Sequence, residues 1–363
     1  MIIGALSDTH SDRANALPHI MKEFKERNVD VIIHCGDIEL QHVIPEIFNG
    51  LEVTCALNQE QLVKFPIENP PLGWTFTAPN QRVLDIHGIR CYVGHKMSYD
   101  ILASSETKFR EKMEQLGKDF DGLRWIFAGH THHQIFFQTH LINFINPGAV
   151  EDSFDGYEFT IIDTENNQII FCRIPKTKPI ENSFSVGIVS DSLDISKMDI
   201  DFWKKLKKEF QERDVTHIIH CGNISLDDIG QEELAEFTIH YRLRPNQIPR
   251  SSPENWKLVP KNEPIVEING RQFYIHPNLA RTLLEESEVD MDKECLKILE
   301  SYPEVSFVLY GGTNEAFLEE GRKARIINPG GIRSSNRSFA VICMPRIEIT
   351  FGHVPVDPLP SLQ

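Results

Sequence analysis

Two stretches of this chain carry nearly the same sequence. Residues 24–40 read FKERNVDVIIHCGDIEL, and 186 positions later residues 210–226 read FQERDVTHIIHCGNISL. Farther along, FINPGAV at 144–150 returns as IINPGGI at 326–332. The repeated unit is much longer than the roughly 20–50 residues of a solenoid repeat. The chain is therefore predicted to be a tandem duplication of a whole domain.

The length of the chain agrees with two copies. At roughly 150 residues per domain, 363 residues correspond to two domains. The stretch from Thr177 to Ser183 lies in PKTKPIENS, which is polar and punctuated by prolines, as is typical of a linker. We therefore place one domain at 1–178 and the second at 183–363.

Within the first copy, apolar runs alternate with amphipathic stretches. Helical spacing covers 14–27 and 99–120, with Pro18 tolerable only near a helix start. Apolar runs predict strands at 2–6, 31–35, 53–57, 124–128, 135–138 and 142–145, and hairpins at 83–95 and 158–174. Strands that alternate with helices and then form hairpins indicate a mixed α/β domain.

The composition excludes several classes of protein. The chain has 37 basic and 53 acidic residues, a net charge of −16, which disfavours general binding to nucleic acid or anionic membranes. Its apolar runs are far shorter than the roughly 20 residues that span a bilayer, and its first ten residues, MIIGALSDTH, do not read as a signal peptide. The seven cysteines are scattered as single residues. We expect a reduced, cytoplasmic protein.

Polar residues of the first copy cluster where strands should end. They are Asp8, Thr9 and His10, then Gly36 and Asp37, Asn58, Gly94 and His95, and the run Gly129, His130, Thr131 and His132. The carboxyl ends of strands are where α/β sheets gather their sites. Carboxylates, imidazoles and an amide oxygen suit a divalent metal such as Mn, Fe or Zn. On an extended segment, Asp8 and His10 would face the same side and share one metal.

The order DxH, GD, N, GH and GHTH resembles the calcineurin-like metallophosphoesterases. The short spacing, the GHTHH ending and NPGAV are similar to the small bacterial phosphodiesterase branch, to which the retromer subunit of eukaryotes is related. The resemblance implies two packed mixed sheets flanked by helices in each domain, a four-layer αββα sandwich. It also implies hydrolysis of a phosphate ester by a metal-bridging hydroxide, in a phosphodiesterase rather than a phosphomonoesterase.

The resemblance further implies two divalent metal ions, with Mn preferred and Fe, Zn or Ni as alternatives. The first would be held by Asp8, His10, Asp37 and His132, and the second by Asp37, Asn58, His95 and His130. Asp37 would bridge the two ions, and Asp37, Asn58 and His95 would be the catalytic residues. Two cations about 3.5–4 Å apart can clamp a phosphoryl group.

Other interpretations of single residues stay open at this point. Asp8 could cap the helix that follows, although Ser11 or Asp12 could do so as well. His34 recurs as His220, so we interpret it as a core residue, and Cys35 and Cys221 as small buried hydrophobes. His42, His87, His133 and His140 are expected at the surface or near the site.

Two residues depart from the family pattern. Leu57 replaces the usual glycine before the ligand Asn58 and could narrow the site. Gln59 stands where many large phosphatases have a histidine, and it cannot transfer a proton. The small branch also commonly lacks that histidine.

The second copy has lost most of the ligand types. Asp8 aligns with Asp191, but His10 aligns with Leu193 and Asp37 with Asn223. Asn58 aligns with Arg244 or Asn246, His95 with Pro277 beside His276, and the run from Gly129 to His132 with Gly311, Gly312, Thr313 and Asn314. The second domain is therefore predicted to be a metal-free pseudoenzyme copy.

Two hypotheses follow for the whole chain. The first is an enzyme whose single site lies in the first domain, with the second domain as its intramolecular partner and the chain as a monomer. The second is a non-catalytic interaction scaffold with a vestigial metal site. The identity of the phosphate-ester substrate cannot be read from the sequence. Trp74 or Phe76 could contact it, but Trp74 recurs as Trp256, which favours a structural role.

Overall fold

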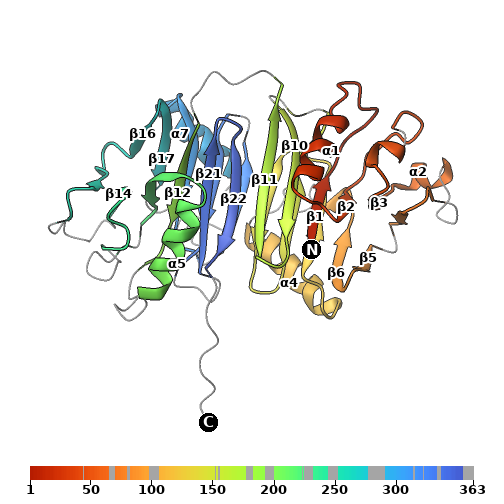
Figure 1. The fold of residues 1–363 in the computed structure, drawn as a ribbon, viewed down its shortest axis with the longest axis horizontal. Coiled ribbons are helices and arrows are strands. Elements are labelled where there is room, and N and C mark those ends of the chain that lie inside the picture. Colours follow the sequence, from red (N-terminus) through yellow and green to blue (C-terminus); the bar gives the residue numbers. More distant parts are fainter. Residues whose placement is uncertain are drawn as a thin grey trace, which may run out of the picture.

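The computed structural model describes most of the chain (Figure 1). The described residues are 1–43, 45–64, 70–79, 82–97, 106–151, 153, 156–176, 183–192, 200–222, 224, 232–243, 252–276, 291–313, 315–321, 323–332 and 337–354. The predicted linker at 177–182 and the first part of the helix expected at 99–120 lie outside these residues.

Two large mixed β-sheets form the framework. Within the described residues the larger has twelve strands, in the order β15 (Trp256–Leu258), β14 (Thr238–Tyr241), β13 (Val215–His220), β12 (Phe184–Val189), β21 (Ser338–Met344), β22 (Glu348–His353), β11 (Gln168–Pro175), β10 (Gly156–Asp163), β1 (Ile2–Leu6), β2 (Val31–His34), β3 (Glu52–Ala56) and β4 (Trp74–Thr77). Its first-half strands confirm the predicted strands near the N-terminus and the hairpin at 158–174.

The smaller sheet is built in the same manner. Its ten strands, counted over the same residues, run β16 (Ile265–Ile268), β17 (Arg271–His276), β18 (Val305–Tyr310), β20 (Arg325–Pro329), β19 (Ala316–Glu320), β8 (Gln134–Gln138), β9 (Asn143–Pro147), β7 (Trp125–Phe127), β6 (Ile89–Val93) and β5 (Val83–Ile86). The strands β5 and β6 are the two strands expected around the turn at His87 and Gly88.

Helices cover the outer faces of both sheets and complete four layers. Helix α1 (Leu17–Glu26) packs on β1–β3 and α5 (Ile200–Gln211) on β12–β14, both on the twelve-stranded sheet. Helices α4 (Glu106–Asp119) and α7 (Met291–Ser301) pack on the ten-stranded sheet. Alternate residues of both sheets fill one apolar core between them. The αββα layering inferred from the motifs is thus the arrangement found.

Neither half has sheets of its own, which differs from the expected pair of separate sandwiches. β11 pairs with β22 in one sheet, and β8 pairs with β19 in the other, both antiparallel. Figure 1 shows β11 and β22 side by side between the two halves. Reading outward from this junction, β11-β10-β1-β2-β3-β4 corresponds to β22-β21-β12-β13-β14-β15. Pairing in this way covers strand edges that would otherwise expose unpaired backbone groups.

Helix α1 shows how the sequence fixes a local element. Leu17, Ile20, Met21 and Phe24 recur at helical spacing and are buried against the sheet. The backbone N–H of Ala16 donates to the carboxylate of Asp12 at 2.7 Å. Asp12, one of the three capping candidates, therefore accepts from the backbone N–H groups at the start of this helix, whose N-cap residue is Ala16. Asp8 does not have that role. Among the described residues, no helix is long and apolar enough to cross a membrane.

Candidate metal centre

The predicted ligands lie in loops that directly follow parallel strands. Asp8 and His10 follow β1, and Asp37 follows β2. His95 follows β6, and the loop with His130 and His132 follows β7. Both sheets therefore bring the ends of their strands to one place, as the position of the motifs predicted.

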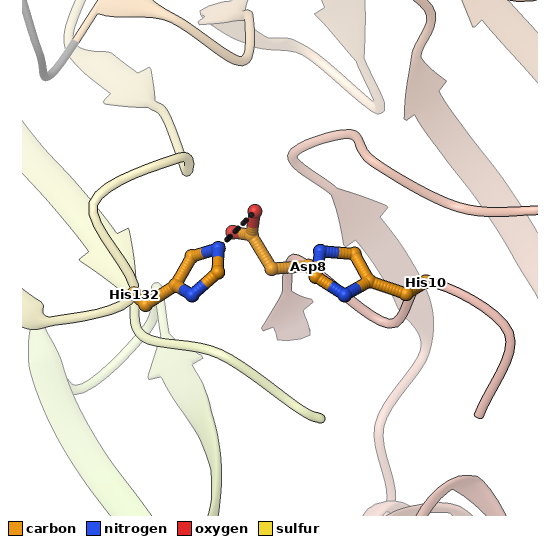
Figure 2. A group of neighbouring side chains, drawn as sticks. All are labelled: Asp8, His10 and His132. Carbon is orange, nitrogen blue, oxygen red and sulfur yellow. Dashed lines mark ion pairs between the residues drawn. The ribbon is translucent and has the colours of Figure 1, made fainter. Parts of the chain in front are cut away.

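Asp8, His10 and His132 form one group of potential ligands. One ligand atom from each lies within 4.8 Å of the other two. His132 Nε2 is 3.3 Å from Asp8 Oδ1, and Figure 2 shows the Asp8 carboxylate between the two imidazoles. A carboxylate with two imidazoles is a donor set suited to Zn, Mn or Fe.

Asp8, Asp37 and His95 form a second group, again within 4.8 Å. His95 Nε2 is 3.8 Å from Asp8 Oδ1 and 3.9 Å from Asp37 Oδ2. Asp37 also reaches toward the first group, because its Oδ2 is 3.4 Å from His10 Nε2. Asp8 is thus common to both groups, and Asp37 lies between His10 and His95.

The surroundings of His95 fit a metal ligand. Its Nδ1 is 3.1 Å from the carbonyl oxygen of Cys35, so the neutral ring carries its proton there. Burial lowers the pKa of His95, although Asp8 and Asp37 oppose the effect. In the neutral ring the lone pair of Nε2 faces two carboxylates, an arrangement that a cation between them would stabilise. A histidine held through its other nitrogen by a backbone carbonyl is the usual arrangement of a metal ligand.

The two oxygens of Asp8 have different surroundings. Oδ2 accepts a hydrogen bond from the backbone N–H of His130 at 3.0 Å, which ties the two ligand loops together. Oδ1 is buried and accepts no hydrogen bond. Burial would raise the pKa of Asp8, but His132, His95 and Ser7 together lower it. A buried, ionised oxygen without a hydrogen-bond donor is costly, and a metal ion would satisfy it.

Most of the predicted ligands have an unusual backbone. The φ angles are 53° at Asp8, 45° at His10, 56° at Asp37, 78° at His130 and 60° at His132. Asp8 and His10 share a group as predicted, but through left-handed residues rather than an extended segment. Non-glycine residues in this region cost free energy and cluster at functional sites.

Asn58 lies at the start of helix α2 (Gln59–Lys64). Its Oδ1 accepts a hydrogen bond from the backbone N–H of Gln61 at 2.8 Å, and Gln61 Oε1 accepts one from the N–H of Asn58 at 2.9 Å. This reciprocal pair is a capping box, and the N-x-x-Q spacing was visible in the sequence. Gln61 also donates to the carbonyl of Ile38, next to Asp37. The amide oxygen of Asn58 keeps a second lone pair for a metal.

Two residues that raised questions lie in the core. Leu57 is fully buried in the cluster beneath α1, together with Phe48 and Phe76, so its side chain does not narrow the site. Trp74 is buried in that same cluster, with its ring centroid 5.1 Å from that of Phe48. The structural interpretation of Trp74 therefore holds. The side chain of Gln59 lies outside the described residues.

Asn146 supports the histidine loop, a role that the sequence alone did not reveal. Its Nδ2 donates to the carbonyl of Gly129 at 3.2 Å and to Thr131 Oγ1 at 2.8 Å. The glycine at 129 is required because a Cβ there would lie 1.9 Å from the hydroxyl of Ser7. The INPG and GH motifs are therefore parts of one loop support.

The second half contains counterparts of these supporting bonds. Asp191 Oδ2 accepts a hydrogen bond from the N–H of Gly312 at 2.8 Å, as Asp8 does from His130. Asn328 Nδ2 donates to Thr313 Oγ1 at 2.5 Å, as Asn146 does to Thr131. The positions aligned with the other ligands, at 193, 223, 244, 246, 277 and 314, lie outside the described residues.

A buried histidine of the second half predicts acid sensitivity. Burial lowers the pKa of His220 to about 3, so the unfolded chain binds more protons between that value and about 6.5. Its contribution to stability is present above about pH 6.5 and is lost as the pH falls, by about 1.4 kcal/mol per pH unit. In urea unfolding between pH 6 and pH 5, His220→Asn should show a shallower loss of stability. Parallel curves for the two proteins would contradict this assignment.

Known proteins resemble part of this chain. Residues 1–167 match the model of the Calcineurin-like phosphoesterase superfamily domain. A probable metallophosphoesterase of Methanocaldococcus jannaschii is 29% identical over 151 residues, covering 41% of this chain and 68% of that protein. A phosphodiesterase of the same organism is 25% identical over 181 residues, covering 46% of this chain and 96% of that protein.

Among solved structures, a novel archaeal phosphodiesterase aligns with 48% of this chain and 100% of its own, at 20% identity and a TM-score of 0.36. Over residues 1–167, then, the chain is similar to the calcineurin-like phosphoesterase superfamily domain, as the order of its ligand motifs predicted.

Proposed function

We propose that the first half is a binuclear metal-dependent phosphoesterase with its active site at the loops after β1, β2, β3, β6 and β7. The observation that carries the proposal is the convergence of His95 Nε2 with the carboxylates of Asp8 and Asp37, at 3.8 Å and 3.9 Å. The buried Oδ1 of Asp8, 3.3 Å from His132 Nε2, and the match of residues 1–167 support it independently.

The residues divide into two ligand sets that share carboxylates. Asp8, His10, Asp37 and His132 would hold one ion, and Asp37, Asn58, His95 and His130 would hold the other, with Asp37 shared by both. The two groups of neighbouring side chains around Asp8 support these sets. His130 lies beside His95, with ring centroids 4.9 Å apart. Divalent cations there, with Mn preferred, would supply Lewis-acid stabilisation of the phosphoryl oxygens and would lower the pKa of a water, so that hydroxide is available to attack phosphorus.

The substrate class is a phosphate ester, and we favour a diester. The name of one relative, a phosphodiesterase, supports this choice. With a net charge of −16, the protein as a whole repels phosphates, so the attraction must come from cations at the site. We also propose a cytoplasmic location, since the six cysteines whose side chains are described are free.

Metal removal and reconstitution test the enzyme proposal. Hydrolysis of a generic aryl phosphodiester should fall to background after chelation and return when Mn²⁺ is added, because the bound cations would stabilise the charge on the phosphoryl oxygens. Tight Mn²⁺ binding without turnover of any ester would instead favour the interaction scaffold. Absence of Mn²⁺ binding would contradict the enzyme proposal.

We further propose that residues 183–363 are a degenerate copy of 1–178 that binds no metal and serves as its partner within a monomer. The corresponding strand orders and the paired bonds of Asp191 and Asn328 support the duplication. The β11–β22 and β8–β19 pairings support the partner role.

Metal analysis and sedimentation test this second proposal. The Mn²⁺-loaded protein should hold at most two ions per chain, because only the first half keeps the ligand types, and it should sediment as a monomer. A third ion retained after mutation of the first-half ligands would contradict the metal-free second half. A stable dimer would contradict the partner role.

A further inference from the structure

His34 connects the two loops that carry Asp8 and Asp37. It ends strand β2, and its side chain is fully buried. Its Nε2 is 3.0 Å from Thr9 Oγ1, and its Nδ1 accepts a hydrogen bond from the backbone N–H of Gly36 at 3.1 Å. One imidazole therefore contacts a residue of each loop.

The hydrogen-bond partners determine the form of this ring. A backbone N–H can only donate, so Nδ1 must be the acceptor toward Gly36. In the neutral ring the proton then lies on Nε2, which donates it to the hydroxyl of Thr9. Burial lowers the pKa of His34 to about 3, which agrees with a neutral ring. Both ring nitrogens are fully used, and none is left for a metal.

The two partners of His34 are direct sequence neighbours of predicted metal ligands. Thr9 lies between Asp8 and His10, and Gly36 directly precedes Asp37. Backbone bonds join the same loops, from Asp8 N–H to Gly36 at 3.0 Å and from His10 N–H to Asp37 at 2.9 Å. The imidazole adds a second link between these two loops, close to where His10 Nε2 and Asp37 Oδ2 come within 3.4 Å.

We propose that His34 is a positioning residue for the metal centre: through Thr9 and Gly36 it sets the spacing between the ligands of the β1 loop and Asp37. The inference rests on the proposed metal-dependent function. His34 itself contacts neither a metal ion nor a substrate. Partners that orient metal ligands typically contribute about 10–100-fold to metal affinity or activity.

The second half supplies a natural control for this role. His220 Nε2 is 2.8 Å from Ser192 Oγ, and its Nδ1 accepts a hydrogen bond from the N–H of Gly222 at 3.3 Å. The same link thus joins loops that have lost most ligand types. If the histidine contributes only to folding stability, that contribution should be similar in both halves. An effect on metal affinity, by contrast, can arise only in the first half.

The test compares His34→Asn with His220→Asn in the full chain. Asparagine can still accept from the glycine N–H, but it is too short to reach Thr9 or Ser192. Mn²⁺ alone is titrated into metal-free protein, and the melting temperature is measured beside it. We expect His34→Asn to weaken Mn²⁺ binding by about tenfold or more, and His220→Asn to bind as the wild type does. Both should lower the melting temperature by a similar amount.

A second pair of variants covers the case in which His34→Asn fails to fold. Thr9→Val removes the hydroxyl at nearly constant shape, and Ser192→Ala is its control. Unchanged Mn²⁺ binding in the first-half variants, or equal weakening in the second-half ones, would overturn the positioning role alone. A wild-type protein that binds no Mn²⁺ would overturn the proposed function and this inference together.

Discussion

Asp8→Asn should lower kcat/KM for a generic aryl phosphodiester by at least about a thousandfold, more than the 10–100-fold typical of residues that only orient a ligand. Asp8 is common to both ligand groups, and its Oδ1 is the buried oxygen without a hydrogen-bond donor. Asparagine tolerates the left-handed backbone at this position and can still accept from His130 through its amide oxygen. The variant should therefore fold while its metal affinity falls. Steady-state kinetics and Mn²⁺ titration measure the two effects.

Asp191→Asn is the matched control for Asp8. Asp191 has the same backbone conformation, with φ of 58°, and accepts the corresponding bond from Gly312. It should leave kcat/KM and Mn²⁺ binding unchanged. Turnover by Asp8→Asn at the wild-type rate would show that the reaction does not use this centre.

Glu320→Gln should destabilise the folded chain by about 3–5 kcal/mol, the usual cost of breaking a buried ion pair from one side. Glu320 of β19 pairs with Arg173 of β11 and with Arg325 of β20, the latter at 2.7 Å. The Arg173 side chain is only 4% exposed and also pairs with Glu158. Burial would raise the pKa of Glu320, but Arg325 and Arg173 lower it to about 2. The substitution therefore removes the ionised carboxylate that pairs with both arginines at the junction of the halves.

Urea unfolding at pH 7, followed by tryptophan fluorescence, measures this loss. Arg346→Ala is the control, because Arg346 also joins the two halves, through Glu23 at 2.8 Å, but is 58% exposed. Exposed ion pairs contribute about 0–1 kcal/mol to the free energy of unfolding. Similar losses in the two variants would show that the buried network has no special part in holding the halves together.

Much of the fold could be predicted because the decisive signals are local. Apolar runs gave the strands of the first half, and the repeated HIIHCG sequence gave the duplication hypothesis. The joining of β11 with β22 and of β8 with β19 could not be foreseen. No residue pattern in an edge strand identifies the strand that pairs with it, because the pairing is made by backbone groups.

The ligands of the candidate site could be predicted from the sequence, but the residues that support them could not. The residue types of Asp8, Asp37 and His95 were enough to predict their convergence, because strand ends meet at one edge. The supports were missed, since His34 and Asn146 act through backbone groups and hydroxyls that no spacing rule identifies. The left-handed conformation at His10 was missed as well, because histidine gives no signal for it.

The left-handed ligand residues suggest how a duplicated site decays. A histidine in this conformation costs about 1–2 kcal/mol, a penalty that glycine avoids and asparagine partly avoids. In the second half, His130 is replaced by Gly312, whose φ is 99°, and Asp37 and His132 are replaced by Asn223 and Asn314. Under the proposed duplication, the losses of His130 and His132 exchanged a residue selected for chemistry for one that tolerates a left-handed backbone, whereas His10 was exchanged for Leu193. At these positions the residues needed for activity lower the stability of the fold. A copy that is no longer selected for catalysis can therefore accept substitutions that stabilise it without changing its fold.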